Sequence, residues 1–129
     1  MGLLQPHGRR GRARGQARLK TVTVSNLPQA RAALDAARVA GEAIALASPP
    51  DAAIQYGVLF YVKLSERLAA DYPDLKPVIA VDCGDRADLA HDALRLGLKS
   101  IVFRGDPRSA EKLSDIAASL AIRFEAKPT

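Results

Sequence analysis

Short apolar runs that end abruptly at polar residues, each followed by a helical segment, constrain the fold of this chain most strongly. The clearest run is Val78–Val81, which stops at Asp82. An apolar run bounded by turn residues is typical of a buried strand in a parallel sheet. The other expected strands are 21–24, 43–47, 100–103 and the alternating, edge-like segment 122–125. The pattern predicts an α/β protein with the element order βαβαβαβαβ.

Two arrangements of five mostly parallel strands fit this order, because crossovers between parallel strands are right-handed. In a doubly wound, flavodoxin-like sheet, helices cover both faces. In a half-barrel, the strands lie in sequential order with every helix on one face, and another subunit has to cover the other face. We expect the doubly wound arrangement, since a single chain of 129 residues then covers both faces by itself. The half-barrel is the alternative.

The distribution of charge separates a tail from a domain. Residues 1–20 hold six basic residues and no acid, whereas the rest of the chain holds 13 basic and 14 acidic residues. We expect residues 1–19 to form a disordered basic tail that binds nucleic acid only non-specifically. Residues 20–126 are predicted to form one α/β domain, and residues 127–129 a C-terminal tail.

Cysteine content and hydropathy indicate a cytoplasmic protein. Cys83 is the only cysteine, which excludes an intrachain disulfide and fits a reducing compartment. No apolar stretch approaches the ~20 residues that span a bilayer. The N-terminal residues lack the apolar core of a signal peptide. No contact with a membrane is therefore expected.

Capping residues predict where the helices begin. Asn26 is expected to cap the helix after the first strand. Asp85, with Asp88 three residues further on, resembles a capping box for the helix after the third strand. Asp106 is expected to cap the last helix, with Pro107 in its first turn.

A single long helix is predicted over residues 51–71, with a broad apolar side formed by Val58, Phe60, Tyr61, Val62, Leu64 and Leu68. Tyr56 and Leu59 fall on the polar side of this helix. Gly57 costs ~1 kcal/mol relative to alanine and lets another backbone approach closely. One interpretation is a wide core-facing side with two stray apolar residues. The other is a self-association surface at Tyr56, Gly57 and Leu59 that makes the protein a homodimer.

Three segments carry a resemblance to known proteins: Leu46–Pro50, Val81–Asp85, and the stretch from Ala93 through Gly105. Over most of residues 21–120 the chain resembles a family of small uncharacterised proteobacterial α/β proteins with the sequence Asp-Cys-Gly-Asp in a βα repeat. This resemblance implies an α/β fold and brings no activity with it.

Polar residues gather where the predicted strands end. Ligands bind at the carboxyl ends of the strands in open α/β sheets. Asp82 directly follows a buried strand, so it is expected either to pair with Arg104 of the neighbouring strand or to face solvent as a functional group. We expect a partly exposed pair that positions an anionic ligand above Gly105. The full set of candidate ligand-binding residues is Ser48, Asp82, Cys83, Asp85, Arg104, Gly105 and Asp106.

Three functions from different classes follow. The first is a binding or regulatory module for a phosphate- or carboxylate-bearing ligand at this edge. The second is a small enzyme that uses Asp82 with a metal or with Arg104. The third is a homo-oligomeric assembly protein that self-associates through helix 51–71. Cys83 has no histidine nearby to act as a base, so we expect a buried structural cysteine. No cofactor and no metal are expected, because the chain lacks GxGxxG and Walker motifs and its first strand ends in Ser25-Asn26.

Overall fold

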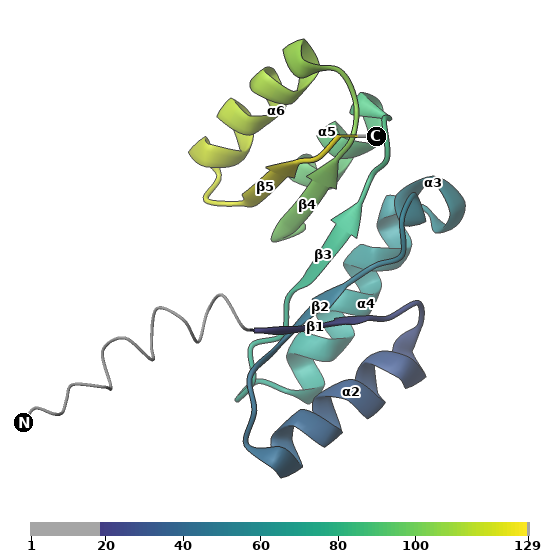
Figure 1. The fold of residues 1–129 in the computed structure, drawn as a ribbon, viewed down its shortest axis with the longest axis vertical. Helices are drawn as coiled ribbons and strands as arrows, with labels where there is room; N and C mark the ends of the chain where they lie inside the picture. Colours follow the sequence, from purple (N-terminus) through teal and green to yellow (C-terminus); the bar gives the residue numbers. More distant parts are fainter. Residues whose placement is uncertain (1–18, 129) are drawn as a thin grey trace, which may run out of the picture.

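The computed structural model describes residues 19–128, and in it five strands alternate with helices (Figure 1). All but the last residue of the tail predicted for residues 1–19 lies outside the described residues. The strands are β1 (Lys20–Thr23), β2 (Ile44–Ala47), β3 (Ile79–Asp82), β4 (Ser100–Phe103) and β5 (Arg123–Ala126). The helices are α2 (Leu27–Ala40), α3 (Ala52–Tyr56), α4 (Val58–Asp71), α5 (Ala87–Arg95) and α6 (Pro107–Ser119).

All five strands are parallel, and they pair in the order β1-β2-β3-β4-β5. The predicted α/β class, with one five-stranded parallel sheet in a single domain, is confirmed. The strand order is the sequential one of the alternative arrangement, with β1 at the edge instead of between β2 and β3 as in a flavodoxin-like sheet. An edge position suits β1, because Lys20, Thr21 and Thr23 are exposed polar residues.

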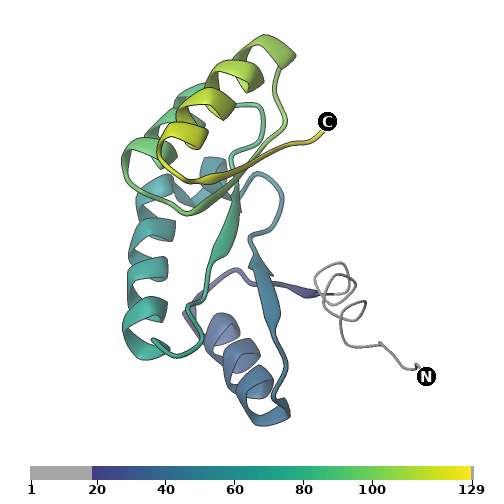
Figure 2. The same ribbon diagram turned by 90° about the vertical axis from the view of Figure 1, so that its left-hand side faces the viewer.

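The helices lie on one side of the sheet (Figure 2). This follows from the strand order, because each right-handed crossover leads to the next strand in the same direction. Between the two layers lies one core, in which Leu46, Val81 and Ile101 from the central strands are buried together with Leu34 of α2 and Leu113 of α6. The core therefore needs only one layer of helices.

The other face of the sheet carries no helix of the described residues. Thr23, Ala47, Ala80 and Ser100 lie in one row across four strands, and they are small side chains. Small residues on a sheet face leave room for another surface to approach closely.

The strand pairing is shortest between β2 and β3. These strands pair only at Leu46 with Ile79 and at Ala47 with Ala80, whereas β1 with β2 and β4 with β5 each pair over four residues. On the helical side, the N-terminal part is also attached through two ion pairs. Arg31 of α2 contacts Asp71 at the end of α4 at 2.7 Å, and Arg38 contacts Asp74 in the following turn at 2.6 Å.

The helix predicted over residues 51–71 is in fact two helices, α3 and α4, so the prediction of one continuous helix is wrong. The break lies at Gly57. Its φ of +89° is a left-handed value that residues other than glycine rarely adopt. Apart from the chain neighbours of Gly57, no atom of the described residues lies within 4 Å of a Cβ placed there. Gly57 is therefore needed for the turn between α3 and α4, and no other segment of the described residues packs closely against it.

Two tyrosines differ in how their hydroxyl groups are satisfied, and this gives a paired prediction. The Tyr61 hydroxyl is fully buried and has no hydrogen-bond partner among the described residues, whereas the Tyr72 hydroxyl donates to Asp35 Oδ1 at 2.8 Å. Tyr61→Phe is therefore expected to raise the free energy of unfolding by about 1 kcal/mol, since it removes an unsatisfied polar group. Tyr72→Phe should lower it by about 1 kcal/mol. Urea denaturation of both variants measures the two signs, and a loss of stability in Tyr61→Phe would contradict the prediction.

Candidate functional site at the carboxyl edge of the sheet

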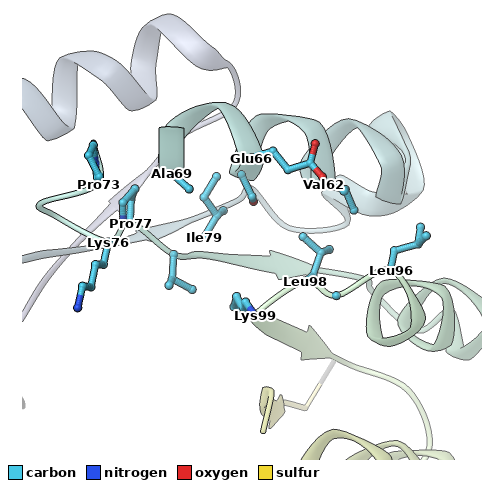
Figure 3. A pocket seen from close by; sticks show the side chains of 13 residues that line it. Val62, Glu66, Ala69, Pro73, Lys76, Pro77, Ile79, Leu96, Leu98 and Lys99 are labelled. Atoms are coloured by element: carbon cyan, nitrogen blue, oxygen red, sulfur yellow. The ribbon is translucent and has the colours of Figure 1, made fainter. Parts of the chain in front are cut away.

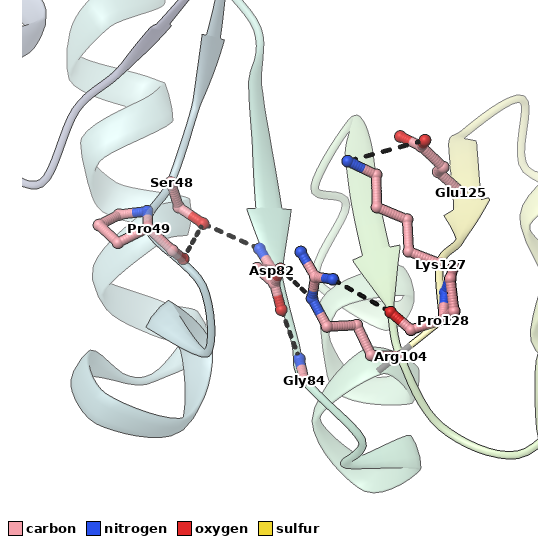
Figure 4. A network of polar contacts seen from close by, with 8 residues as sticks. All are labelled: Ser48, Pro49, Asp82, Gly84, Arg104, Glu125, Lys127 and Pro128. Carbon is pink, nitrogen blue, oxygen red and sulfur yellow. Dashed lines mark hydrogen bonds and ion pairs between the residues drawn. The ribbon is translucent and has the colours of Figure 1, made fainter.

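The predicted site residues lie at or just after the carboxyl ends of β2, β3 and β4, and these ends share one edge of the sheet. The structure joins three of them, Ser48, Asp82 and Arg104, in one hydrogen-bonded network (Figure 4). The network continues to Pro128 at the end of the described chain. The other predicted residues, Cys83, Asp85, Gly105 and Asp106, lie beside this network and make no side-chain hydrogen bond within it.

Asp82 and Arg104 form the expected ion pair across neighbouring strands. Arg104 Nε–H donates to Asp82 Oδ2 at 2.8 Å, while the other carboxylate oxygen accepts the backbone N–H of Gly84 at 2.8 Å. The side chain of Asp82 is only 6% exposed, and that of Arg104 is 27% exposed. Both oxygens of a nearly buried carboxylate are thus satisfied, as a buried charge requires.

Ser48 connects the end of β2 to this pair. Its Oγ accepts the backbone N–H of Asp82 at 2.9 Å and donates to the carbonyl oxygen of Pro49 at 3.1 Å. These two bonds satisfy a buried hydroxyl and hold the start of the loop after β2 against β3. Ser48 is therefore a positioning residue for Asp82, and its side chain is turned toward the backbone.

The end of the chain contributes to the site, which the sequence interpretation missed. Arg104 Nη1 donates to the carbonyl oxygen of Pro128 at 3.4 Å, and Lys127 lies 3.9 Å from Glu125. The backbone N–H of Lys127 donates to Phe103 O at 2.9 Å, so the β4–β5 ladder continues past the expected domain end at residue 126. The sequence signal for Lys127 was its position directly after the fifth strand, since Arg104 directly follows β4 and Asp82 is the last residue of β3.

Asp85 does not cap α5, and this prediction is wrong. The residue at the N-cap is Arg86, which makes no side-chain capping bond, and Asp85 is exposed. Arg86 instead makes two hydrogen bonds to Asp88, at 2.9 and 2.7 Å, and these bonds hold the pKa of the Asp88 carboxyl below its usual value. The positive φ of Gly84 turns the chain before Asp85, which moves the helix start one residue along.

Asp106 caps α6 as predicted. Its Oδ2 accepts the backbone N–H of Ser109 at 3.0 Å, and this bond is the main cause that lowers the pKa of the Asp106 carboxyl. The protein's own carboxylate therefore occupies the N-terminus of α6, directly after Gly105. Gly105 is needed for another reason, since a Cβ there would overlap the ring of Phe103.

Cys83 is fully buried, as expected for a structural cysteine. Burial, with a smaller contribution from the charge of Asp82, raises the pKa of the Cys83 thiol to about 12. A thiol with this pKa is protonated at neutral pH, and the thiolate is the form that acts as a nucleophile.

The Cys83 thiol gives a prediction about alkaline stability. The unfolded chain loses the thiol proton near pH 9.0 and the native chain only near pH 12, so this contribution to stability is intact below pH 9. Above that pH the contribution of the thiol to the free energy of unfolding should decrease by about 1.4 kcal/mol per pH unit, because the unfolded state then binds fewer protons than the native state. Denaturant unfolding of wild type and Cys83→Ala measures it as the difference between two pH profiles. Parallel profiles above pH 9 would contradict the prediction.

The predicted interface residues lie around the break between α3 and α4. Tyr56 and Leu59 are both exposed, the latter by 57%. The apolar pattern predicts Phe60 on the core-facing side, yet Phe60 is 39% exposed, because the buried side of α4 is centred on Tyr61, Leu64 and Leu68. The Phe60 ring packs against Tyr56 with ring centroids 5.8 Å apart. The exposed aromatic surface is therefore larger than predicted.

Two wider properties complete the description of residues 19–128. No three histidine, cysteine or acidic side chains in this part of the chain gather closely enough to hold a metal ion. None of its helices is long and apolar enough to cross a membrane.

Comparison with known proteins gives no family: no family model matches the chain, and no curated protein matches its sequence.

Proposed function

We propose that this domain is a binding or regulatory module that takes a phosphate- or carboxylate-bearing ligand at the carboxyl edge of the sheet, with Arg104 as the principal contact. The supporting observation is how Arg104 is held. Nε is fixed on Asp82 and Nη1 on Pro128, while Nη2 has no hydrogen-bond partner among the described residues. A guanidinium held in one orientation with donors to spare suits planar or tetrahedral anions.

Lys127 is the second expected contact. Its ion pair with Glu125 is long, at 3.9 Å, and both side chains are about half exposed, so an anionic ligand can compete for the lysine. Lys127, Gly105 and Pro128 line one shallow hollow between α6 and β5. Because Asp106 occupies the N-terminus of α6, we assign the recognition of the anion to side chains and not to that helix.

Inorganic phosphate tests this proposal, with chloride at equal ionic strength as the reference. Phosphate should raise the melting temperature of the wild type and shift the amide resonances of Arg104 and Gly105 in a saturable way. Arg104→Lys keeps the charge beside Asp82 but loses the fork of donors, and it should abolish the saturable shift. Arg108→Gln removes an exposed cation of α6 outside the network and serves as the matched control. Equal responses in wild type and Arg104→Lys would exclude Arg104 as the contact.

The small-enzyme alternative has less support. Both oxygens of Asp82 are engaged, by Gly84 and by Arg104, and Cys83 keeps its proton at neutral pH. We also propose a cytoplasmic location, since the free buried thiol of Cys83 fits a reducing compartment.

A second candidate function is self-association through the exposed aromatic surface of Tyr56, Leu59 and Phe60. Its specific support is that three large apolar side chains are exposed together on two consecutive helices. In this proposal the protein is a homodimer, and ligand binding and assembly use different elements of the fold.

Leu59→Lys tests the homodimer. The wild type should sediment as a dimer at high concentration, and the variant as a monomer, because a charge is introduced into the apolar contact. Val39→Lys is the matched control, since Val39 of α2 is 89% exposed and lies outside this surface. A monomeric wild type would exclude the homodimer, and an equal effect of Val39→Lys would exclude this surface as its contact.

A further inference from the structure

A second candidate binding site lies at the opposite, amino edge of the central strands. There, a cavity of about 500 Å³ separates α4 from the segments around the starts of β3 and β4 (Figure 3). Its apolar lining includes Val62 and Ala69 of α4, Val78 and Ile79 at the start of β3, and Leu96 and Leu98 before β4. A cavity of this volume with a mainly apolar lining is typical of small-molecule sites.

Two of the lining residues are left uncovered in the free protein. Val78 is 45% exposed and Leu96 is 39% exposed, although both are large apolar side chains at the cavity. Apolar surface of this kind is removed from water when an apolar group enters the cavity. The lining therefore favours an apolar ligand body.

The charged residues of the lining favour a negative ligand head. Lys76 and Lys99 make no ion pair among the described residues, whereas the one acid of the lining, Glu66, is 3.7 Å from Lys63. The cavity thus has two uncompensated positive charges at its margin, and a ligand carboxylate complements them.

The backbone at Lys76 supplies an independent observation. Its φ is +47°, a left-handed value for a residue with a side chain, and the next residue is Pro77, which disfavours helical conformations before it. The turn is held by the N–H groups of Leu75 and Lys76, which both donate to Tyr72 O. Strained residues of this kind cluster at binding sites, where the surrounding structure maintains them.

We propose that this cavity binds a small amphipathic carboxylate, whose apolar body contacts Val78 and Leu96 and whose anionic head interacts with Lys76 and Lys99. The ligand class is that of a short or medium-chain fatty acid or an apolar acid of similar volume. The site is separate from the network of Asp82 and Arg104, and the proposal does not depend on the function assigned there.

Octanoate, below its micellar concentration, is the probe, and the full chain is titrated by calorimetry and amide NMR. Wild type should bind with saturable shifts at Gly97 and Leu98. Ala69→Phe fills the cavity and should weaken binding at least tenfold. Ala70→Phe adds the same ring to the next exposed position of α4, outside the lining, and should leave binding unchanged. Absence of octanoate binding to wild type, or equal binding by the two variants, would overturn the proposal.

The head group is tested separately. Replacing Lys76 and Lys99 together by Gln should weaken octanoate several-fold and leave octanol binding unchanged, since octanol has the same chain without the charge. An equal loss for both probes would overturn the role of the two lysines. Arg104→Lys should keep the octanoate-induced shifts at Gly97 and Leu98, because Arg104 does not line this cavity. Failure at one site is then distinguishable from failure at the other.

Discussion

Replacing Arg104 by Gln is expected to lower the free energy of unfolding by about 3–5 kcal/mol, because it leaves the buried carboxylate of Asp82 without its counter-charge. The side chain of Asp82 is 6% exposed and has little access to water, so no solvent compensates the loss. Asp82→Asn should cost less, since the partner that it leaves uncompensated is Arg104, which is partly exposed. From most to least stable, the predicted order is therefore wild type, Asp82→Asn and Arg104→Gln.

Urea denaturation of the two variants and of the double variant measures this order and the coupling between the residues. Asp85→Asn and Arg108→Gln are the controls, since both residues are exposed and make no side-chain ion pair among the described residues. Each control should change stability by less than about 0.5 kcal/mol. If Arg104→Gln cost no more than its control, the pair would be a surface contact and its burial would have no energetic consequence.

Gly84→Ala is expected to destabilise the protein by roughly 3 kcal/mol, for two separable reasons. The first is conformational, because φ at Gly84 is +59°, where a Cβ is strained. The second is steric, because the new Cβ would lie 2.5 Å from Asp51 Oδ1 and 2.8 Å from Ile54 Cδ1. The substitution would also disturb the bonds that Gly84 makes to Asp82 through its N–H and to Arg104 through its carbonyl.

Gly41→Ala separates the two reasons. Gly41 has a similar φ of +68°, but apart from its chain neighbours no atom of residues 19–128 lies within 4 Å of a Cβ placed there. It should therefore show only the conformational cost of about 1–2 kcal/mol. Denaturation curves of the two variants give the steric part as their difference. Equal losses would show that Asp51 and Ile54 move aside without cost.

Local signals in the sequence predicted much of this structure. Asn26 and Asp106 cap their helices as expected, because capping depends on residues three positions apart. The pairing of Asp82 with Arg104 was also predictable, since neighbouring parallel strands end at the same edge of the sheet.

The remaining features depend on contacts that the sequence does not display. Glycine within a helical pattern is compatible with either a continuous helix or a break, and the left-handed φ of Gly57 decides for a break. The strand order depends on how whole elements pack, although the polar residues of β1 were consistent with an edge. The position of Pro128 beside Arg104 is a contact between two strand ends that are 24 residues apart in sequence.

The narrow pairing between β2 and β3 has a consequence for how the molecule opens. Two residue pairs and the two hydrogen bonds of Ser48 to Ala80 and Asp82 join β2 to β3, so detachment of the unit β1-α2-β2 would leave the ladders inside each half intact. Part of its remaining attachment consists of the exposed pairs of Arg31 with Asp71 and Arg38 with Asp74, which salt weakens. Partial opening of the N-terminal unit should therefore become more frequent as ionic strength rises, and the backbone amides of β2 would then exchange with solvent before those of β4.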